Sequence, residues 1–214
     1  KYDALGNCIY KKPPGCDPIH MKYDKSDWLV FSQDGNQRVK GEWRFFFHDL
    51  FGRPTVTGIW KSPTVPATED NVIRTTPAAD GSLAGYTVNL SLPAVELMTV
   101  NYYDDYAFTS GLPNLAYSTP PAGYDSRFTG AKGLLTGTRT HRLDDPSKQT
   151  ITALYYDHRG RIVQRRSTNH LGGYDLEYFA YTFTGKVKQR QIVHSVPGKT
   201  TQTEVYAYDY GTPA

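Results

Sequence analysis

The stretch Tyr156-Asp157-His158-Arg159-Gly160-Arg161 decides the fold of this chain. Asp at the first position of a turn and Gly three positions later are the preferences of a type I turn. The Asp carboxylate can also accept the backbone N–H two residues on. Gly160 then takes the left-handed conformation, which gives a three-residue hairpin loop with a bulge. The stretch therefore predicts a β-hairpin, in which Tyr156 ends one strand and Arg161 begins the next.

The same pattern, which we call the signature, recurs along the chain with substitutions. His48 replaces Tyr in one copy, Asp27 stands at the Gly position of another, and Thr182 replaces the Asp of a third. Successive copies begin 21 to 27 or 53 to 55 residues apart, and the long gaps leave room for a degenerate repeat or an insertion. A period in the twenties fits one hairpin per repeat. The signature residues are Tyr2, Asp3, Gly6, Tyr23, Asp24, His48, Asp49, Gly52, Arg53, Tyr103, Asp104, Tyr156, Asp157, Gly160, Arg161, Tyr181, Gly185, Lys186, Tyr208 and Asp209.

The composition favours an all-β fold. The 17 Tyr suit pleated, half-buried surfaces, and the 19 Gly and 14 Pro suit frequent turns. Alternation over 201–210 and 87–92 predicts strands, and Trp43–Phe47 predicts a strand with aromatic residues on both faces. We expect one repeat segment over 1–214, built as consecutive β-hairpins in a twisted, curved antiparallel sheet. Irregular insertions interrupt it near 61–85, with one helical turn around 68–73, and near 109–126.

The charge pattern argues against nucleic acid as a partner. The net charge is only +3, and acidic and basic residues are well mixed, whereas a nucleic-acid surface needs clustered positive charge. Cys8 and Cys16 flank a plausible turn, so a disulfide and two free thiols are both open. No apolar run is long enough to span a membrane. The chain shows no signal peptide, but we interpret it as an excised segment, so this does not locate the parent protein.

We predict no catalytic residue, no metal and no cofactor. The six histidines lack the spacing of a metal site. The acidic pairs Asp104-Asp105 and Asp144-Asp145 are sequence neighbours, which point to opposite faces of a strand rather than across a cleft. No nucleophile elbow, phosphate-binding loop or dinucleotide fingerprint occurs.

Two aromatic groups remain open to a binding interpretation. Tyr102, Tyr103 and Tyr106 form either a sugar-stacking platform or a ladder that holds the sheet together. Tyr206, Tyr208 and Tyr210 share one face of a predicted strand, which is either covered by a second layer or an exposed sticky surface.

Over nearly its whole length, the ordered set of these motifs resembles bacterial RHS/YD-repeat proteins. The resemblance is carried by Asp49-x-x-Gly52-Arg53-Pro54, Val100–Tyr106, Tyr155–Gln164 and Asn169–Gly173. It implies hairpins wound into a spiralling sheet that closes into a shell. In polymorphic toxins the shell encloses a C-terminal toxic domain, and the parent proteins are secreted or displayed at the cell surface. The self-cleaving segment of many members has no counterpart after Asp17-Pro18 or Asp145-Pro146, so that activity is not implied.

These observations lead to one main hypothesis and an alternative. The chain is expected to be a non-enzymatic scaffold, whose partners are the rest of a parent RHS chain and an enclosed toxin domain. The alternative is a carbohydrate- or receptor-binding module, and an enzyme is a third hypothesis. Because terminal hairpins expose unpaired backbone groups, we also expect copies of the chain to pair edge to edge.

Overall fold

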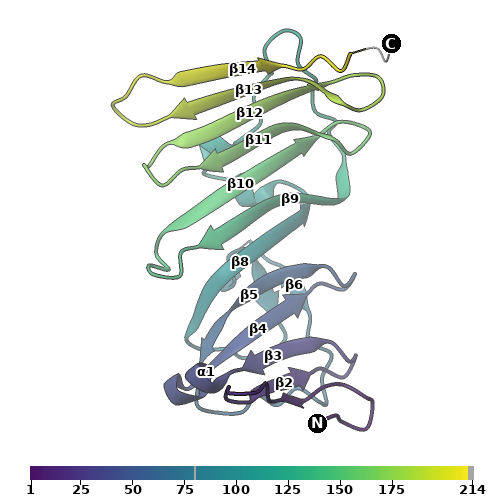
Figure 1. The fold of residues 1–214 in the computed structure, drawn as a ribbon, viewed down its shortest axis with the longest axis vertical. Coiled ribbons are helices and arrows are strands. Elements are labelled where there is room, and N and C mark those ends of the chain that lie inside the picture. Colours follow the sequence, from purple (N-terminus) through teal and green to yellow (C-terminus); the bar gives the residue numbers. More distant parts are fainter. Residues whose placement is uncertain (80, 212–214) are drawn as a thin grey trace. The chain divides into compact units, whose positions relative to one another are not determined.

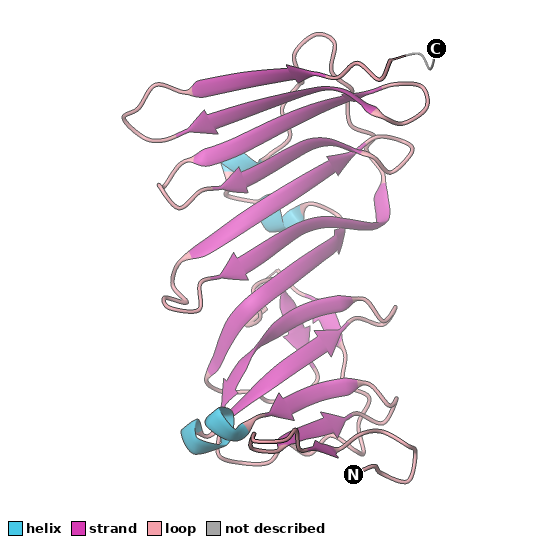
Figure 2. Ribbon diagram, viewed as in Figure 1, coloured by secondary structure: helices cyan, strands magenta, loops and turns pink. Residues whose placement is uncertain are grey.

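The computed structural model describes residues 1–79 and 81–211, and over these residues it confirms an all-β fold (Figures 1 and 2). Twelve strands form one open antiparallel sheet, and two more form a separate pair, β6–β7. The strands of the large sheet are β1 (Tyr10–Lys11), β2 (Ile19–Tyr23), β3 (Leu29–Gln33), β4 (Glu42–His48), β5 (Pro54–Lys61), β8 (Val95–Asp104), β9 (Ala131–His141), β10 (Gln149–Tyr156), β11 (Ile162–Thr168), β12 (Tyr174–Tyr181), β13 (Val187–Ser195) and β14 (Gln202–Ala207).

The order of strands in the large sheet follows the order of the chain. Each strand pairs with the one before it, and the only departure is between β5 and β8, where β6 and β7 are left out. Neighbouring antiparallel strands need only short turns, so a chain of hairpins builds this sheet without crossover connections. The prediction of consecutive hairpins is therefore confirmed.

A short helix, α1 (Gly35–Lys40), was not expected from the sequence. Asp34 caps it: the Asp34 side chain accepts the N–H of Gln37, and the Gln37 side chain accepts the N–H of Asp34. Gly41 ends it in the left-handed conformation. This reciprocal capping box satisfies the first free N–H groups, which stabilises a helix that is otherwise only six residues long.

The chain has two compact units, which are described separately. The first comprises residues 1–100 and 141–148. Its core includes Phe31, Phe45 and Phe47, with the last two rings stacked at 4.7 Å between centroids. The β4 strand buries its aromatic side chains mainly on one face. Phe46 on the other face is half-buried beneath the guanidinium of Arg44, so the expected two-sided aromatic strand is only partly present.

The irregular segment of the first unit, residues 62–94, is part of its core. It contains β6 (Thr75–Pro77) and β7 (Tyr86–Val88), and it buries Ile73, Leu83 and Tyr86. The expected helical turn around 68–73 is instead a single β-turn, closed by the N–H of Asn71 and the carbonyl of Thr68. The strand expected over 87–92 ends at Val88. The insertion thus extends beyond its predicted end at residue 85.

The second unit comprises residues 101–140 and those from 149 onward. Its buried cluster is centred on Tyr155, whose hydroxyl donates to the carbonyl of Leu115 at 2.7 Å. Leu115 lies in η2 (Pro113–Leu115), which follows η1 (Ala107–Thr109) in the irregular segment 105–130. Gln164 of β11 is fully buried and bonds to the backbone of Ser118 through both its amide oxygen and its amide nitrogen. The insertion expected near 109–126 therefore supplies side chains to the core.

Two further expectations concern the two cysteines and the presence of membrane-spanning segments. Cys8 and Cys16 are both free thiols. Among the described residues, no helix is both long enough and apolar enough to cross a membrane.

Candidate functional site

The signature turns are the most regular sites in the structure, and Asp157 shows their geometry. Its Oδ1 atom accepts the backbone N–H of Arg159 at 2.8 Å and of Arg161 at 3.0 Å. Its carbonyl accepts the N–H of Gly160 at 3.1 Å, and Gly160 has a φ of 74°. One carboxylate oxygen therefore holds both ends of the loop, while glycine takes the conformation that other residues adopt only at a cost.

The same geometry recurs at Asp3, Asp24 and Asp49. In each turn, Oδ1 accepts the N–H groups two and four residues on, at 2.8 to 3.1 Å. Asp27 stands at the glycine position of the Asp24 turn and still has a φ of 60°. Asp is among the few non-glycine residues that tolerate this conformation, so the departure in sequence leaves the turn intact.

Two turns of the same form have another side chain in place of Asp. Thr182 accepts the N–H of Lys186 through its hydroxyl, and Gly185 has a φ of 87°. Asn169, which was not counted as a repeat, accepts the N–H groups of Leu171 and Gly173 through Oδ1. The signal for Asn169 was present in the sequence: a short side-chain acceptor stands three positions before Gly172. Thr168 stands at the aromatic position of this copy, and the missing aromatic residue hid it.

In four copies of the signature, the aromatic residue stands at a β-bulge. The antiparallel register shifts at this residue, which pairs with the residue six positions later. The pairs are Tyr23 with Leu29, His48 with Pro54, Tyr156 with Ile162, and Tyr181 with Val187. A bulge next to a left-handed residue increases the local twist of the strand pair.

At four places a tyrosine hydroxyl joins a strand to an earlier hairpin. Four hydroxyls donate to backbone carbonyls at 2.5 to 3.3 Å, and every acceptor stands two positions after a glycine with positive φ. The pairs are Tyr23 with Cys8, Tyr156 with Leu135, Tyr181 with Ile162, and Tyr210 with Val187. The tyrosine is therefore a cross-link between neighbouring hairpins, which its hydroxyl allows and phenylalanine would not.

The basic residue after the glycine neutralises the carboxylate of its own turn. Arg53 Nε lies 2.7 Å from Asp49 Oδ2, and Arg161 Nε lies 2.6 Å from Asp157 Oδ2. Arg161 also lies over the ring of Tyr181 at 4.4 Å. These contacts explain why the signature ends in arginine: its planar group serves the carboxylate and the aromatic ring together.

The Asp24 turn obtains its guanidinium from a distant part of the chain. Trp28 stands where arginine would be, and Arg74 of the 62–94 insertion bonds instead to Asp24 Oδ2 at 2.5 Å. The Arg74 guanidinium also lies 3.7 Å from the centre of the Trp28 ring. Asp24 and Arg74 are almost completely buried, so the insertion is held at its centre by a buried ion pair.

Two partial copies of the signature do not form such turns. Tyr103 and Asp104 lie inside β8, and Asp104 Oδ1 accepts the N–H of Gly133 from β9, beyond the 105–130 segment. The carboxylate thus still joins two strands, but 26 residues are inserted between them. Tyr208 and Asp209 follow β14, and Asp209 accepts only a local bond from the N–H of Gly211 among the described contacts.

The proposed stacking residues Tyr102, Tyr103 and Tyr106 do not form an open platform. Tyr102 is buried and stacks on Phe108 at 4.3 Å, and Tyr106 stacks on Tyr155 at 4.5 Å. Burial raises the pKa of the Tyr106 hydroxyl, which donates to the carbonyl of Leu154. Tyr103 is half-buried in β8. Of the two interpretations left open by the sequence, the ring contacts of Tyr102 and Tyr106 favour the structural one.

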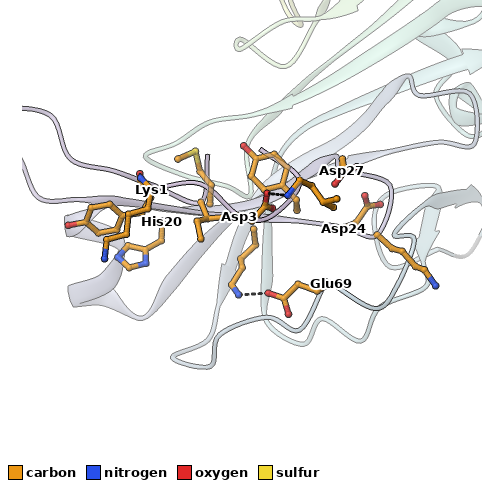
Figure 3. A pocket seen from close by; sticks show the side chains of 13 residues that line it. Lys1, Asp3, His20, Asp24, Asp27 and Glu69 are labelled. Carbon is orange, nitrogen blue, oxygen red and sulfur yellow. Dashed lines mark hydrogen bonds and ion pairs between the residues drawn. The ribbon is translucent and has the colours of Figure 1, made fainter. Parts of the chain in front are cut away.

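A cavity of about 500 Å³ in the first unit gathers several charged side chains (Figure 3). Its carboxylates have partners in the chain: Glu69 pairs with Lys22 at 2.8 Å, and Asp27 accepts the side-chain N–H of Asn7 at 2.9 Å. Asp3 and Asp24 hold their own turns. The acidic groups of this cavity are therefore engaged in turns or paired with other side chains of the chain.

The histidines are dispersed in the structure. Across residues 1–79 and 81–211, no three His, Cys, Asp or Glu side chains gather closely enough to hold a metal ion.

Comparisons with known proteins do not identify a family for this chain. Neither a family model nor a curated protein matches the chain. A chain of the crystal structure of TcdB2-TccC3-TEV superposes on 96% of this chain with a TM-score of 0.39 and 11% sequence identity. The match spans 9% of that chain, and a score this low supports no conclusion about fold or function.

Removing the Asp157 carboxylate should destabilise the second unit. We expect Asp157→Ala to lower the free energy of unfolding by about 2–4 kcal/mol, because it removes charge-assisted bonds to two N–H groups and to Arg161. Urea unfolding followed by circular dichroism measures this. The matched control is Asp209→Ala, at an exposed Asp of a partial copy, which should unfold close to wild type. Equal effects at the two sites would contradict the role given to the signature turn.

The same carboxylate should make stability depend on pH. Burial favours the neutral form of Asp157, but the N–H groups and guanidinium of Arg161 outweigh it, and the pKa of Asp157 is lowered. A lowered pKa contributes stability that is present above the unfolded value of about 3.9 and is lost as pH falls through the folded value. We therefore expect the unfolding free energy to fall below about pH 5, and less steeply in Asp157→Asn. Asn169 shows that an amide can close such a turn, so this variant should fold; identical pH slopes would refute the assignment.

An arginine at position 28, four residues after Asp24, should partly take over the role of Arg74. Arg74→Ala leaves Asp24 buried without its guanidinium and should cost about 3 kcal/mol. Adding Trp28→Arg to that variant should restore part of the loss, because it recreates the spacing of Asp49 and Arg53. Arg142→Ala, which breaks an exposed pair with Asp144, serves as the control and should have little effect. Thermal and urea unfolding of the four proteins test this, and failure of Trp28→Arg to rescue would argue against the equivalence.

Proposed function

We propose that this chain is a non-enzymatic structural scaffold, a run of β-hairpins within a larger RHS-type protein. The observation that carries the proposal is the use of the signature residues. Their carboxylates hold their own turns, their arginines neutralise those carboxylates, and their tyrosine hydroxyls bond to the preceding hairpin. Groups engaged in this way are committed to joining hairpins, which is the chemistry of a sheet that grows by repetition.

The larger context of the scaffold rests on the resemblance in sequence. We propose that the parent protein is secreted or displayed at the cell surface and that it encloses or displays a C-terminal toxin or effector domain. The partners of this segment are then the remaining hairpins of the parent chain and that domain. The two insertions support a structural role, because each gives its unit a second layer of buried side chains.

The alternative, a carbohydrate-binding module, must use aromatic side chains other than Tyr102 and Tyr106. The two most exposed aromatic side chains are at the tips of signature turns, where Phe51 is 81% and Phe183 is 88% exposed. Arginines flank both rings, at 5.1 Å for Arg53 and 5.6 Å for Arg159. These rings lie on separate turns of different units.

A glycan array separates the two functions. The scaffold proposal expects no saturable binding by the wild-type chain, because the signature side chains are engaged in hydrogen bonds within the sheet. The comparison protein is a Phe51→Ala, Phe183→Ala double variant, with Val39→Ala on α1 as a control at another exposed apolar residue. Specific binding that is lost in the double variant and kept in the control would replace the scaffold with a binding module.

A further inference from the structure

Signature turns in the second unit are joined by a cation that lies over a tyrosine ring. The guanidinium of Arg161 lies 4.4 Å from the centre of the ring of Tyr181, which stands at the aromatic position of a later turn. The Tyr181 hydroxyl donates to the carbonyl of Ile162, the residue directly after Arg161. Lys186 likewise lies 4.7 Å from the centre of the Tyr210 ring. Arginine, lysine and tyrosine ordinarily titrate at about pH 10 or above, so such a link keeps the same charge across the neutral range.

The first unit contains the corresponding contact with the two kinds of residue exchanged. Trp28 stands at the basic position of the Asp24 turn, and His48 stands at the aromatic position of the Asp49 turn. The two rings are in edge-to-face contact, with centroids 5.1 Å apart and planes at 73°. The side chain that can carry a charge is now on the aromatic side of the contact, and histidine ordinarily titrates near pH 6.5. This link, unlike the one between arginine and tyrosine, can therefore change its charge near neutral pH.

The insertion 62–94 is attached to the large sheet at the same place. The Arg74 guanidinium lies 3.7 Å from the centre of the Trp28 ring. The next residue, Thr75, donates from its hydroxyl to the carbonyl of His48 at 3.2 Å. A change at His48 therefore acts where the insertion meets the sheet.

The surroundings of His48 favour the neutral ring. Its Nδ1 atom is buried and has no hydrogen-bond partner among the described residues, so a proton placed there would be an unpaired buried N–H group. Burial, followed by the charge of Arg74, lowers the pKa of His48, while the carboxylates of Asp24 and Asp49 act in the opposite direction. Those carboxylates already have guanidinium partners, Asp24 in Arg74 and Asp49 in Arg53. Protonation of His48 would therefore add a second cation beside Arg74.

An open hollow beside the imidazole gives solvent access to it. The hollow has a volume of about 460 Å³ and is lined by Asp27, Trp28, Leu29, Phe46, His48 and Gly52. The Asp27 carboxylate accepts the side-chain N–H of Asn7 at 2.9 Å, so it too has a partner. The hollow also leaves room for a larger ring at position 48. Leu29 directly follows Trp28, as Ile162 follows Arg161, so a tyrosine at position 48 should donate to the Leu29 carbonyl.

We propose that His48 makes the docking of residues 62–94 sensitive to acid, because protonation of its ring weakens the contacts of Trp28 and Arg74 and loosens the insertion. The folded pKa of His48 lies below the unfolded value of about 6.5, so its contribution to stability is complete above about pH 6.5. That contribution is lost as pH falls from the unfolded value through the folded value. The turn carboxylates lose their contribution only below about pH 5, so the two effects are separable.

Urea unfolding of the whole chain between about pH 7.5 and about pH 5.5 tests the proposal. Between the two pKa values, the unfolding equilibrium constant of the wild type should rise by up to about tenfold per pH unit. His48→Phe cannot titrate and should lose this rise. His48→Tyr should lose it as well, and should be more stable than His48→Phe because its hydroxyl reaches the Leu29 carbonyl.

Two controls isolate the effect of His48. His158→Phe, the same change at an exposed histidine of the second unit, should keep the pH dependence of the wild type. Burial also lowers the pKa of His20, but His20 is present in every variant. The difference between the wild type and His48→Phe therefore reports His48 alone. Circular dichroism at about pH 7.5 checks that the variants are folded.

Hydrogen exchange shows whether the insertion is the part that loosens. The N–H of Ile73 bonds to Asp24 Oδ2 at 3.0 Å, so its protection reports the docking of the insertion. After correction for the intrinsic pH dependence of exchange, this protection should fall in acid in the wild type and stay constant in His48→Phe. The N–H of Arg161, which bonds to Asp157 in the second unit, should stay protected in both proteins.

An NMR titration of the wild-type imidazole needs no variant and should place the pKa of His48 below about 6.5. A value at or above 6.5 would overturn the proposal. Equal loss of Ile73 protection in the wild type and His48→Phe would overturn it as well, as would equal pH dependence of unfolding in these two proteins.

Discussion

A carboxylate oxygen that accepts two backbone N–H groups of its own loop is the interaction on which the rest of the structure depends. At Asp157 this bond joins both ends of a five-residue stretch and leaves Gly160 to reverse the chain. Four of these turns follow a bulge at the preceding aromatic residue, and the bulge shifts the register of the hairpin. Because the turns at Thr182 and Asn169 have the same form, the requirement is for a short acceptor rather than for Asp itself.

The other signature residues connect one turn to the next. Tyr181 donates from its hydroxyl to Ile162 at the start of the preceding hairpin, while Arg161 covers the Tyr181 ring and reaches the carbonyl of Thr182. A hairpin alone is at best marginally stable in water, so links of this kind matter most in a sheet built from consecutive hairpins. This arrangement is the physical basis for proposing a scaffold role. The signature side chains are engaged in contacts that hold the sheet together.

The two insertions show how such a sheet acquires a core. A single antiparallel layer cannot bury its apolar side chains by itself, and a second layer is needed. In the first unit that layer comes from residues 62–94 and is tied in by Arg74; in the second it comes from residues 105–130 and is tied in by Gln164. Tyr102 and Tyr106 illustrate the consequence: Tyr102 of β8 stacks on Phe108 of the insertion, and Tyr106 of the insertion stacks on Tyr155 of the sheet.

The sequence by itself determined the turns, the all-β class and the order of hairpins, because each depends on contacts within about six residues. An acceptor, a left-handed residue and an aromatic at fixed spacing are readable without any knowledge of the rest of the chain. Only the tertiary structure decided that the insertions supply core side chains, that Arg74 replaces the missing arginine beside Trp28, and that Tyr106 stacks on Tyr155. Those contacts join residues about 50 positions apart, and no local spacing encodes which distant group fills a buried position.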